Sequence, residues 1–229
     1  MTYKLKNINT SRHIVCFSSI SGSNLYYALI KANEKDIKAY CRESDIENLL
    51  LDAVKLLPDG LSVGDFPKML ADAVETVLTK RVSRYPDLFH VSYVGIALSK
   101  NTVYVCTAGN CRVHLIKNDL LVSSTRDHNL IEEPVEGMGE LSSEPGLALF
   151  YKCIETRQIV ALKSEVRHRA ESIKWEPDGG FTILVCSESF HRFQEPENYI
   201  RSLLRMIDEN RINDETVQNG LISRIDYSA

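Results

Sequence analysis

The chain lacks the features that would assign it to several special classes of protein. No stretch approaches the ~20 consecutive apolar residues that span a bilayer. The N-terminal stretch Met1–His13 has no apolar core segment, so we expect no secretory signal. The formal net charge of −4 offers no basic surface to a polyanion. These absences predict a protein that binds neither membrane nor nucleic acid.

Cysteine is present, but its spacing matches neither a metal site nor a paired disulfide framework. The sequence contains no C-x-x-C pair and no Cys/His set with zinc-ligand spacing. Cys16, Cys106 and Cys186 lie within apolar runs, where a free thiol behaves as a small hydrophobe. Such usage is typical of a reducing compartment, so we expect a cytoplasmic protein.

The composition is that of an ordinary globular protein. Of the 229 residues, 44% are hydrophobic and 25% are charged. There is no internal repeat, no low-complexity tract and no Pro/Gly/Ser linker. We therefore expect a single domain over residues 1–229.

The first part of the chain predicts short strands followed by two helices. The strands are expected at Tyr3–Ile8, Ile14–Ser18, Leu25–Lys31 and Ile37–Cys41. The first helix has a capping-box pattern, Ser44 with Glu47, and ends before Pro58. The second has Asp65 as its N-cap and Pro67 in its first turn, where a missing N–H costs little.

The rest of the chain is rich in strand patterns, with one more helix at Glu197–Glu209. We expect strands at Val91–Leu98, Thr102–Cys106, Cys111–Ile116, Leu120–Val122, Leu147–Glu155, Gln158–Lys163, Glu171–Trp175, Phe181–Cys186 and Leu221–Ile225. Many antiparallel-type strands with helices grouped between them predict an α+β fold built in layers. Val91–Leu98 and Thr102–Cys106 should be neighbours in one sheet.

The stretch Val91–Leu130 is the most informative part of the chain. It contains VSYVGIAL, then TVYVCTAGNCRVHLI, and then a T-R-D-H tetrapeptide. This order resembles the central hairpin of the metal-dependent protein serine/threonine phosphatases of type 2C, which runs A-V-V-A-L, L-Y-V-A-N-x-G-D-S-R and L-T-x-D-H. The resemblance implies two stacked antiparallel sheets flanked by helices, a type 2C phosphatase-like sandwich, over nearly the whole chain.

In that family, carboxylates hold two or more Mg²⁺ or Mn²⁺ ions, which generate a hydroxide nucleophile and clamp the phosphoryl group. Its D-G-H-G-G motif, with the central metal-bridging Asp, ends a strand and precedes the first helix. Carried over residue by residue, most ligand positions fall on side chains that bind such metals poorly. They are Leu25 and Tyr26 for the Glu and Asp of N-E-D, Arg42 for D-G-H-G-G, Asn110 for G-D-S-R, Glu188 for S-D-G and Asn213 for D-N-x-T.

Several of these residues also have simpler interpretations. Asn110 follows Ala-Gly in good turn chemistry for any hairpin. Glu188 is either a surface carboxylate at a strand end or a remnant of the metal site. Arg112 is expected to be a structural hydrogen-bond donor, and His191 is expected on the surface at a helix entry.

The loss of the carboxylates removes the family's mechanism. The sequence therefore predicts a pseudophosphatase with no catalytic residue and no metal or other cofactor, acting as a protein-interaction or scaffold module in intracellular signalling. The partner is expected to be a protein, and a homo-oligomer stays open. One alternative is a divergent but active Mn- or Mg-dependent protein serine/threonine phosphatase that uses Glu188, Asp214 and either Asp36 or Glu43 as ligands. The other is an unrelated intracellular α+β binding domain.

Overall fold

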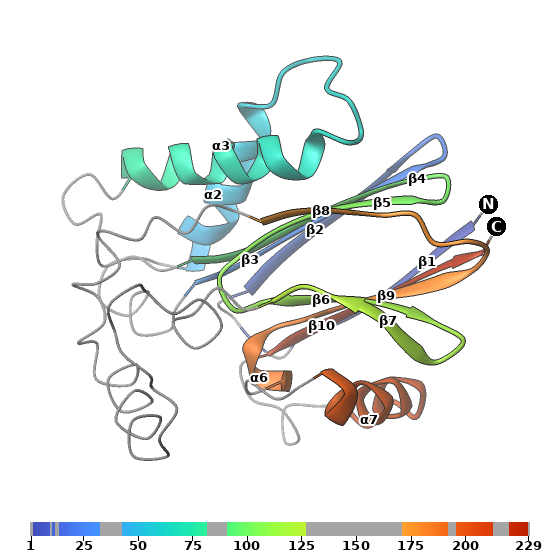
Figure 1. Ribbon diagram of the computed structural model, residues 1–229. Helices are drawn as coiled ribbons and strands as arrows, with labels where there is room; N and C mark the ends of the chain where they lie inside the picture. The colour runs from blue at the N-terminus through green and yellow to red at the C-terminus, as the bar shows by residue number, and fades with distance from the viewer. Residues whose placement is uncertain are drawn as a thin grey trace, which may run out of the picture.

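Two β-sheets lie face to face and helices cover their outer faces (Figure 1). The computed structural model describes residues 2–9, 11, 14–32, 43–81, 91–126, 171–191, 196–212 and 220–228. Every strand pairing within them is antiparallel. The predicted α+β architecture of two stacked antiparallel sheets is confirmed.

Each sheet has five strands. The first sheet has the order β1 (Thr2–Asn9), β10 (Leu221–Ser228), β9 (Phe181–Cys186), β6 (Arg112–Lys117) and β7 (Leu120–Ser124). The second has the order β2 (Ile14–Ser21), β3 (Asn24–Ala32), β4 (Val91–Ser99), β5 (Thr102–Ala108) and β8 (Glu171–Trp175). Strands β4 and β5 pair directly, with Gly95 opposite Cys106, so the predicted adjacency is confirmed.

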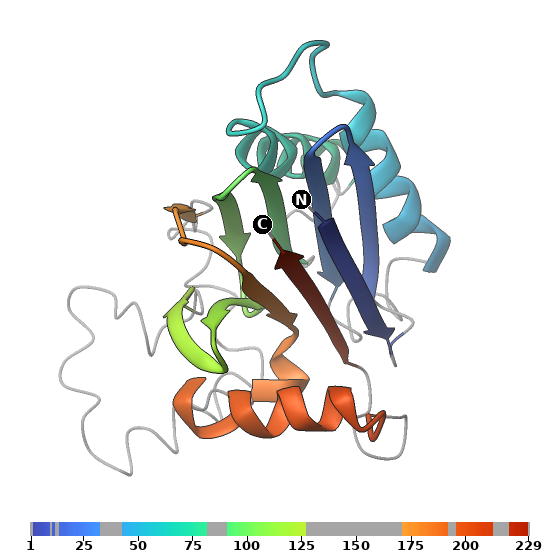
Figure 2. The same ribbon diagram turned by 90° about the vertical axis from the view of Figure 1, so that its right-hand side faces the viewer.

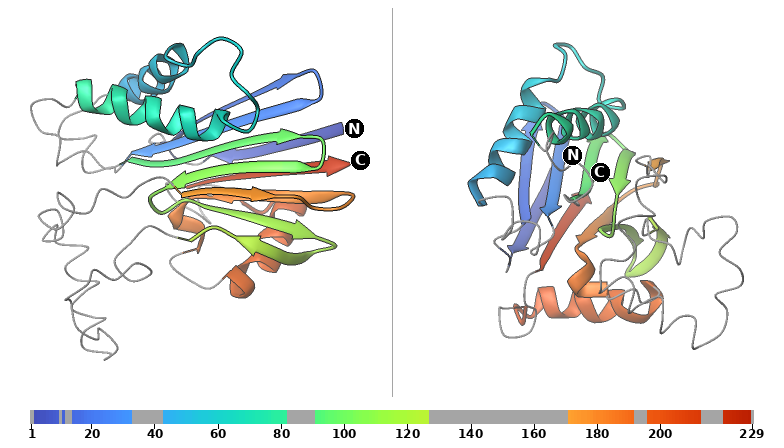
Figure 3. Two further views of the ribbon diagram at one scale, coloured as in Figure 1. Left: turned by 45° about the horizontal axis from the view of Figure 1, so that its top comes forward. Right: turned by 90° about the vertical axis from the view of Figure 1, so that its left-hand side faces the viewer.

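The main core lies between the two sheets. Because side chains alternate along a strand, every second residue of a central strand points inward. On β3 these residues are Leu25, Tyr27 and Leu29, all almost completely buried. They pack against inward-facing residues of the other sheet such as Ile183 and Val185. Figure 3 shows the two layers from two directions.

The helices cover the outer faces of both sheets (Figures 1 and 2). Helices α2 (Glu43–Lys55) and α3 (Phe66–Arg81) pack on the sheet that contains β3. The short helix α6 (Glu188–His191) and helix α7 (Pro196–Asp208) pack on the sheet that contains β9. No helix in the described ranges is long and apolar enough to cross a membrane.

The start of α3 shows how the sequence defines a helix boundary. Asp65 directly precedes the helix, as predicted, and it is held by Ser62, three residues earlier. The Ser62 Oγ accepts a hydrogen bond from the Asp65 N–H at 3.2 Å and donates one to the Asp65 Oδ2 at 2.7 Å. Helix α6 was not predicted, and the predicted strands Ile37–Cys41, Leu147–Glu155 and Gln158–Lys163 lie outside the described residues.

His114 is a fully buried polar residue on the outer face of β6. Its Nδ1 lies 2.8 Å from the Ser124 Oγ on β7, and its Nε2 lies 3.0 Å from the Tyr199 hydroxyl on α7. Burial lowers the pKa of His114 to about 3, and the nearby His191 and Arg112 act in the same direction. The neutral imidazole of His114 therefore links the edge strand β7 to helix α7.

This burial predicts an acid-sensitive fold. The folded pKa of about 3 lies below the ordinary 6.5, so the unfolded chain binds the proton first as pH falls. The contribution of His114 to the unfolding free energy should be fully present above pH 6.5. It should fall by about 1.4 kcal/mol per pH unit between pH 6.5 and about 3, below which both states bind the proton. Urea unfolding at several pH values measures the slope. The variant His114→Gln keeps polar atoms but does not titrate, so its unfolding free energy should depend less steeply on pH. An unchanged pH dependence would contradict the role given to His114.

Candidate functional site

At one end of the sandwich the inward-facing positions change from apolar to polar. Lys31 lies two residues beyond Leu29 on β3, so both side chains are on the inner face. Ser92 on β4 and Thr107 on β5 occupy inward-facing positions at the same end. A group of polar side chains therefore lies at this end of the sandwich, where the apolar core stops.

The opposite sheet contributes Glu188 to this end. Strand β9 ends at Cys186, and Ser187 then makes two 3.0 Å hydrogen bonds with the backbone of Leu221, as N–H donor to its carbonyl and as Oγ acceptor from its N–H. Helix α6 starts at the next residue. The Lys31 Nζ lies 3.6 Å from the Glu188 Oε2, with side-chain exposures of 21% and 36%. This ion pair bridges the two sheets.

The turn between β5 and β6 completes the group. The Asn110 N–H donates to the Ser92 Oγ at 3.1 Å, and its carbonyl accepts a hydrogen bond from the His191 Nε2 at 3.1 Å. Gly109 precedes Asn110 with a φ of 86°, which favours glycine. A Cβ at Gly109 would lie 2.5 Å from the Ser92 Oγ, so the turn packs directly on β4.

These contacts link five residues from both sheets. Lys31 and Ser92 are register partners on adjacent strands, Ser92 bonds to Asn110, Asn110 bonds to His191, and α6 carries both His191 and Glu188. We call these five residues the end cluster. It lies at the α6 end of the sandwich, away from the two chain termini (Figure 1).

The charges of the end cluster are one cation and one anion. Burial lowers the pKa of His191 to about 4, and the Arg112 guanidinium lowers it further, so the imidazole is neutral near pH 7. Lys31 and Glu188 therefore carry the formal charges. His191 was expected on the surface, and that expectation is wrong: this last residue of α6 is fully buried.

The donor set of the end cluster fits a divalent ion poorly. Mg²⁺ and Mn²⁺ prefer several oxygen ligands, including carboxylates. Glu188 is the single carboxylate in the cluster, and the Lys31 ammonium lies beside it. Thr107 Oγ1 and Asn110 Oδ1 are buried oxygens with no hydrogen-bond partner among the described residues, but both are neutral. Across the described parts of the chain, no three His, Cys, Asp or Glu residues group as metal ligands do.

The structure brings together some of the residues that the resemblance singled out. Asn110 and Glu188 both belong to the end cluster. Leu25 is 1% exposed in the apolar core, and at about 3.3 Å per residue it lies about 20 Å along β3 from Lys31. Tyr26 points to the outer face, where its ring packs edge-on against Phe66 at 4.9 Å. Leu25 and Tyr26 are therefore not part of this cluster.

The remaining candidates cannot be located here, because Asp36, Arg42, Asn213 and Asp214 lie outside the described residues, as does the Glu43 side chain. Their assignment stays a prediction. The sequence interpretation missed Lys31, Ser92 and the buried His191. One signal could have pointed to Lys31: it is the last inward-facing residue of a strand pattern in which Leu25, Tyr27 and Leu29 precede it.

Comparison with known proteins supports the fold. No family model matches the sequence, and no curated protein matches it. Solved structures do match over essentially their full length. PppA, described as a key regulatory component of T6SS in Pseudomonas aeruginosa, has a TM-score of 0.63 at 10% identity over 100% of this chain and 99% of its own. A serine/threonine phosphatase of S. agalactiae has a TM-score of 0.62 at 10% identity, with 100% of both chains covered.

A third similar structure is the catalytic domain of the serine/threonine phosphatase PstP, solved in complex with two manganese ions. Its TM-score is 0.55 at 15% identity, over 100% of this chain and 98% of that chain. Identities this low show a shared fold. The fold that the resemblance implied, a type 2C phosphatase-like sandwich, is thus confirmed. An α+β fold of another kind is excluded.

The packing of Gly109 predicts a large effect of one added methyl group. Gly109→Ala places a Cβ 2.9 Å from the Ser92 Cα on a left-handed backbone, so it should lower the unfolding free energy by about 2–4 kcal/mol. Gly179→Ala is the matched control, because its φ is 69° and nothing lies within 4 Å of the added Cβ. The control should lose only about 1–2 kcal/mol. Urea denaturation compares the two, and equal losses would show that the Ser92 contact is unimportant.

Proposed function

We propose that this chain is a single phosphatase-like domain that is catalytically inactive and serves as a protein-interaction module in intracellular signalling. The observation that carries the proposal is the Lys31–Glu188 ion pair at the mouth of the sandwich. A phosphatase of the metal-dependent type needs several carboxylates at its metal site, and a cation beside the single carboxylate of the end cluster does not suit that chemistry.

The position of Lys31 strengthens this interpretation. In the type 2C phosphatases, the central metal-bridging Asp belongs to a motif that ends a strand and precedes the first helix. Strand β3 is the last described strand before α2, and Lys31 is its last inward-facing residue. The sequence alignment puts Arg42 at that Asp instead. Either assignment would put a positive side chain at the position of the family's bridging carboxylate, which supports the proposal.

The electrostatic consequence is direct. Glu188 alone supplies one negative charge, and the Lys31 ammonium at 3.6 Å already neutralises it. A divalent ion placed near Glu188 would be repelled by that ammonium, and partial burial reduces screening by solvent. The ion pair thus links the two sheets at this end without a metal. A protein that keeps the sandwich without the metal retains a folded surface for partners.

The comparison with PppA is consistent with such a role, because that protein is described as a regulatory component of a larger system. The extended outer surfaces of α2, α3 and α7 provide the regular helical faces on which a protein partner could bind. Function on this fold depends on its sites rather than on its architecture. The proposal therefore rests on the end cluster and not on the fold likeness.

Metal binding provides the first test. Calorimetric titration with MnCl₂ should show no binding at roughly micromolar concentration for the wild type, and hydrolysis of p-nitrophenyl phosphate with Mn²⁺ should stay at background. Lys31→Asp should bind Mn²⁺ about tenfold more tightly than Lys31→Met. Both variants remove the cation, but only the first adds a carboxylate next to Glu188.

The opposite result would identify an enzyme. Wild-type turnover well above background that disappears in Glu188→Gln would establish a divergent Mn- or Mg-dependent phosphatase, with Glu188 and Asp214 as candidate ligands. Equal Mn²⁺ affinity in the two Lys31 variants would show that the cluster is not the remnant of a metal site. Circular dichroism of each variant confirms that the sheets remain folded.

Partner binding provides the second test. Affinity capture with the purified protein from its native cell extract should recover a specific protein with the same yield in the presence and absence of EDTA, since no metal is required. A charge-reversed surface variant of an exposed helix position, Arg201→Glu on α7, probes whether that helical face takes part. Loss of capture with EDTA would favour the metal-dependent alternative, and no capture under either condition would count against an interaction role.

A further inference from the structure

The four sheet edges differ in how they are protected against pairing with other strands. The edge strands within the described residues are β1 and β7 in one sheet and β2 and β8 in the other. An edge strand presents unpaired backbone N–H and C=O groups, which form a template for another strand. Natural proteins block such edges with charged residues, proline, bulges or short strands.

Three of these edges carry such protection. Strand β1 has Lys4 and Lys6, and β8 has Glu171 and Lys174. Strand β7 has only five residues, and its pairing with β6 contains a register irregularity. Charges and broken register both disfavour the addition of another strand.

Strand β2 has none of these devices. Its eight residues, IVCFSSIS, include no charge and no proline. Its register with β3 is regular from Ile14 to Ser21. The last five residues of the strand, Phe17–Ser21, are exposed. Among the residues that the structure describes, strand β2 is thus a long, regular and uncharged edge with no strand paired on its outer side.

Exposed apolar side chains accompany this edge. Phe17 is 38% exposed on the helix-facing side of β2, and Ile20 is 61% exposed on the side facing the other sheet. Helix α2 lies over β2 and β3 (Figures 2 and 3). It carries the exposed Leu51, and the exposed Leu56 directly follows its last residue. Exposed apolar side chains on an edge strand, here Phe17 and Ile20, are typical of an interaction surface.

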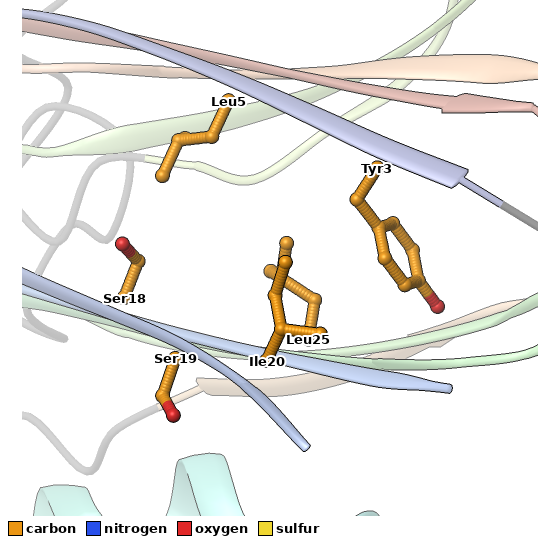
Figure 4. Close-up of a pocket in the computed structure, with 6 residues that line it drawn as sticks. All are labelled: Tyr3, Leu5, Ser18, Ser19, Ile20 and Leu25. Carbon is orange, nitrogen blue, oxygen red and sulfur yellow. The ribbon is translucent and has the colours of Figure 1, made fainter. Parts of the chain in front are cut away.

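The same corner contains a crevice between the sheets. Its volume is about 300 Å³, and it opens between β1 and the hairpin of β2 and β3. Figure 4 shows Tyr3 and Leu5 pointing from β1 toward Ile20 and Leu25. Ser18 lines the crevice from the centre of β2. No lining residue is charged, so the backbone edge and the crevice form one uncharged surface.

We propose that β2 is the contact strand of a two-fold symmetric homodimer, in which the β2 strands of two copies pair antiparallel and join their sheets into one. Antiparallel pairing of a strand with itself satisfies the same row of backbone groups on both copies. Because β2 carries no charge, the pairing places no like charges opposite each other. The chain's own β2 is therefore the strand that this edge accepts.

The strand alternation restricts the register of the dimer. If the two copies keep their inner faces on the same side, even-numbered residues of one β2 must lie opposite even-numbered residues of the other. With Ser18 of both copies on the two-fold axis, Ile20 of each copy lies opposite Cys16 of the other. Ile20 then covers a half-buried inner-face position instead of remaining exposed. This contact is independent of the end cluster, which lies at the other end of β3.

A pair of lysine substitutions tests the interface. Sedimentation equilibrium should find a wild-type dimer, and Ile20→Lys should raise its dissociation constant by about tenfold or more, because a charge is then buried against the second copy. Val122→Lys is the matched control, because Val122 is 57% exposed on the edge strand β7. This substitution should leave the dissociation constant of the dimer unchanged. Circular dichroism verifies the fold of both variants.

A cysteine pair tests the register itself. Directly opposed residues of an antiparallel pair have Cα atoms about 4.5–5.5 Å apart, within the range that a disulfide bridges. Ser18→Cys in a Cys16→Ala background should form a covalent dimer on mild oxidation by oxidised glutathione, and Leu120→Cys in the same background should not. A wild-type monomer at all accessible concentrations overturns the proposal, as does a dimer that survives Ile20→Lys or is lost in Val122→Lys. Neither result affects the proposed loss of catalysis, which the manganese titration decides separately.

Discussion

The structure depends on one regular constraint: every second side chain of the central strands must be apolar so that the two sheets can be buried against each other. Leu25, Tyr27 and Leu29 satisfy it on β3, and Ile183 and Val185 satisfy it on the facing sheet. The same alternation places Lys31 on the inner face, because it occupies the next position in the series. The end cluster is therefore a continuation of the core pattern into a region where solvent can reach the side chains.

The core and the end cluster are energetically separable. The hydrophobic effect scales with the apolar area removed from water, and that area lies along the length of the sandwich. The ion pair between Lys31 and Glu188 is partly exposed, and such pairs contribute only about 0–1 kcal/mol to stability. Substitutions in the end cluster can therefore change the chemistry of this site while leaving the fold intact. This separation is consistent with one architecture that holds two manganese ions in the PstP catalytic domain and the Lys31–Glu188 ion pair in this chain.

The sequence predicted the elements better than it predicted the neighbours of each residue. Strand alternation and turn chemistry located β4, β5 and α3 because these signals are local. The contact between Asn110 and His191 joins residues far apart in the chain, and no local pattern indicates it. The polarity of His191, which is visible in the sequence, predicts a surface position at a helix entry, whereas its burial depends on how α6 packs. The placement of Asn110 and Glu188 at the same end was anticipated only through the family resemblance.

The pairing of β1 with β10 has a consequence for how the protein acquires its structure. Tyr3 lies opposite Tyr227, so β1 pairs with a strand from the far end of the chain. Contacts of such high sequence separation close large loops and slow folding. A chain emerging from the ribosome cannot form this pair until β10 has been synthesised, whereas the hairpins β2–β3 and β4–β5 are available much earlier. The sheet that contains β3 can therefore assemble its hairpins first, and the sheet that contains β1 is completed at the last stage of folding.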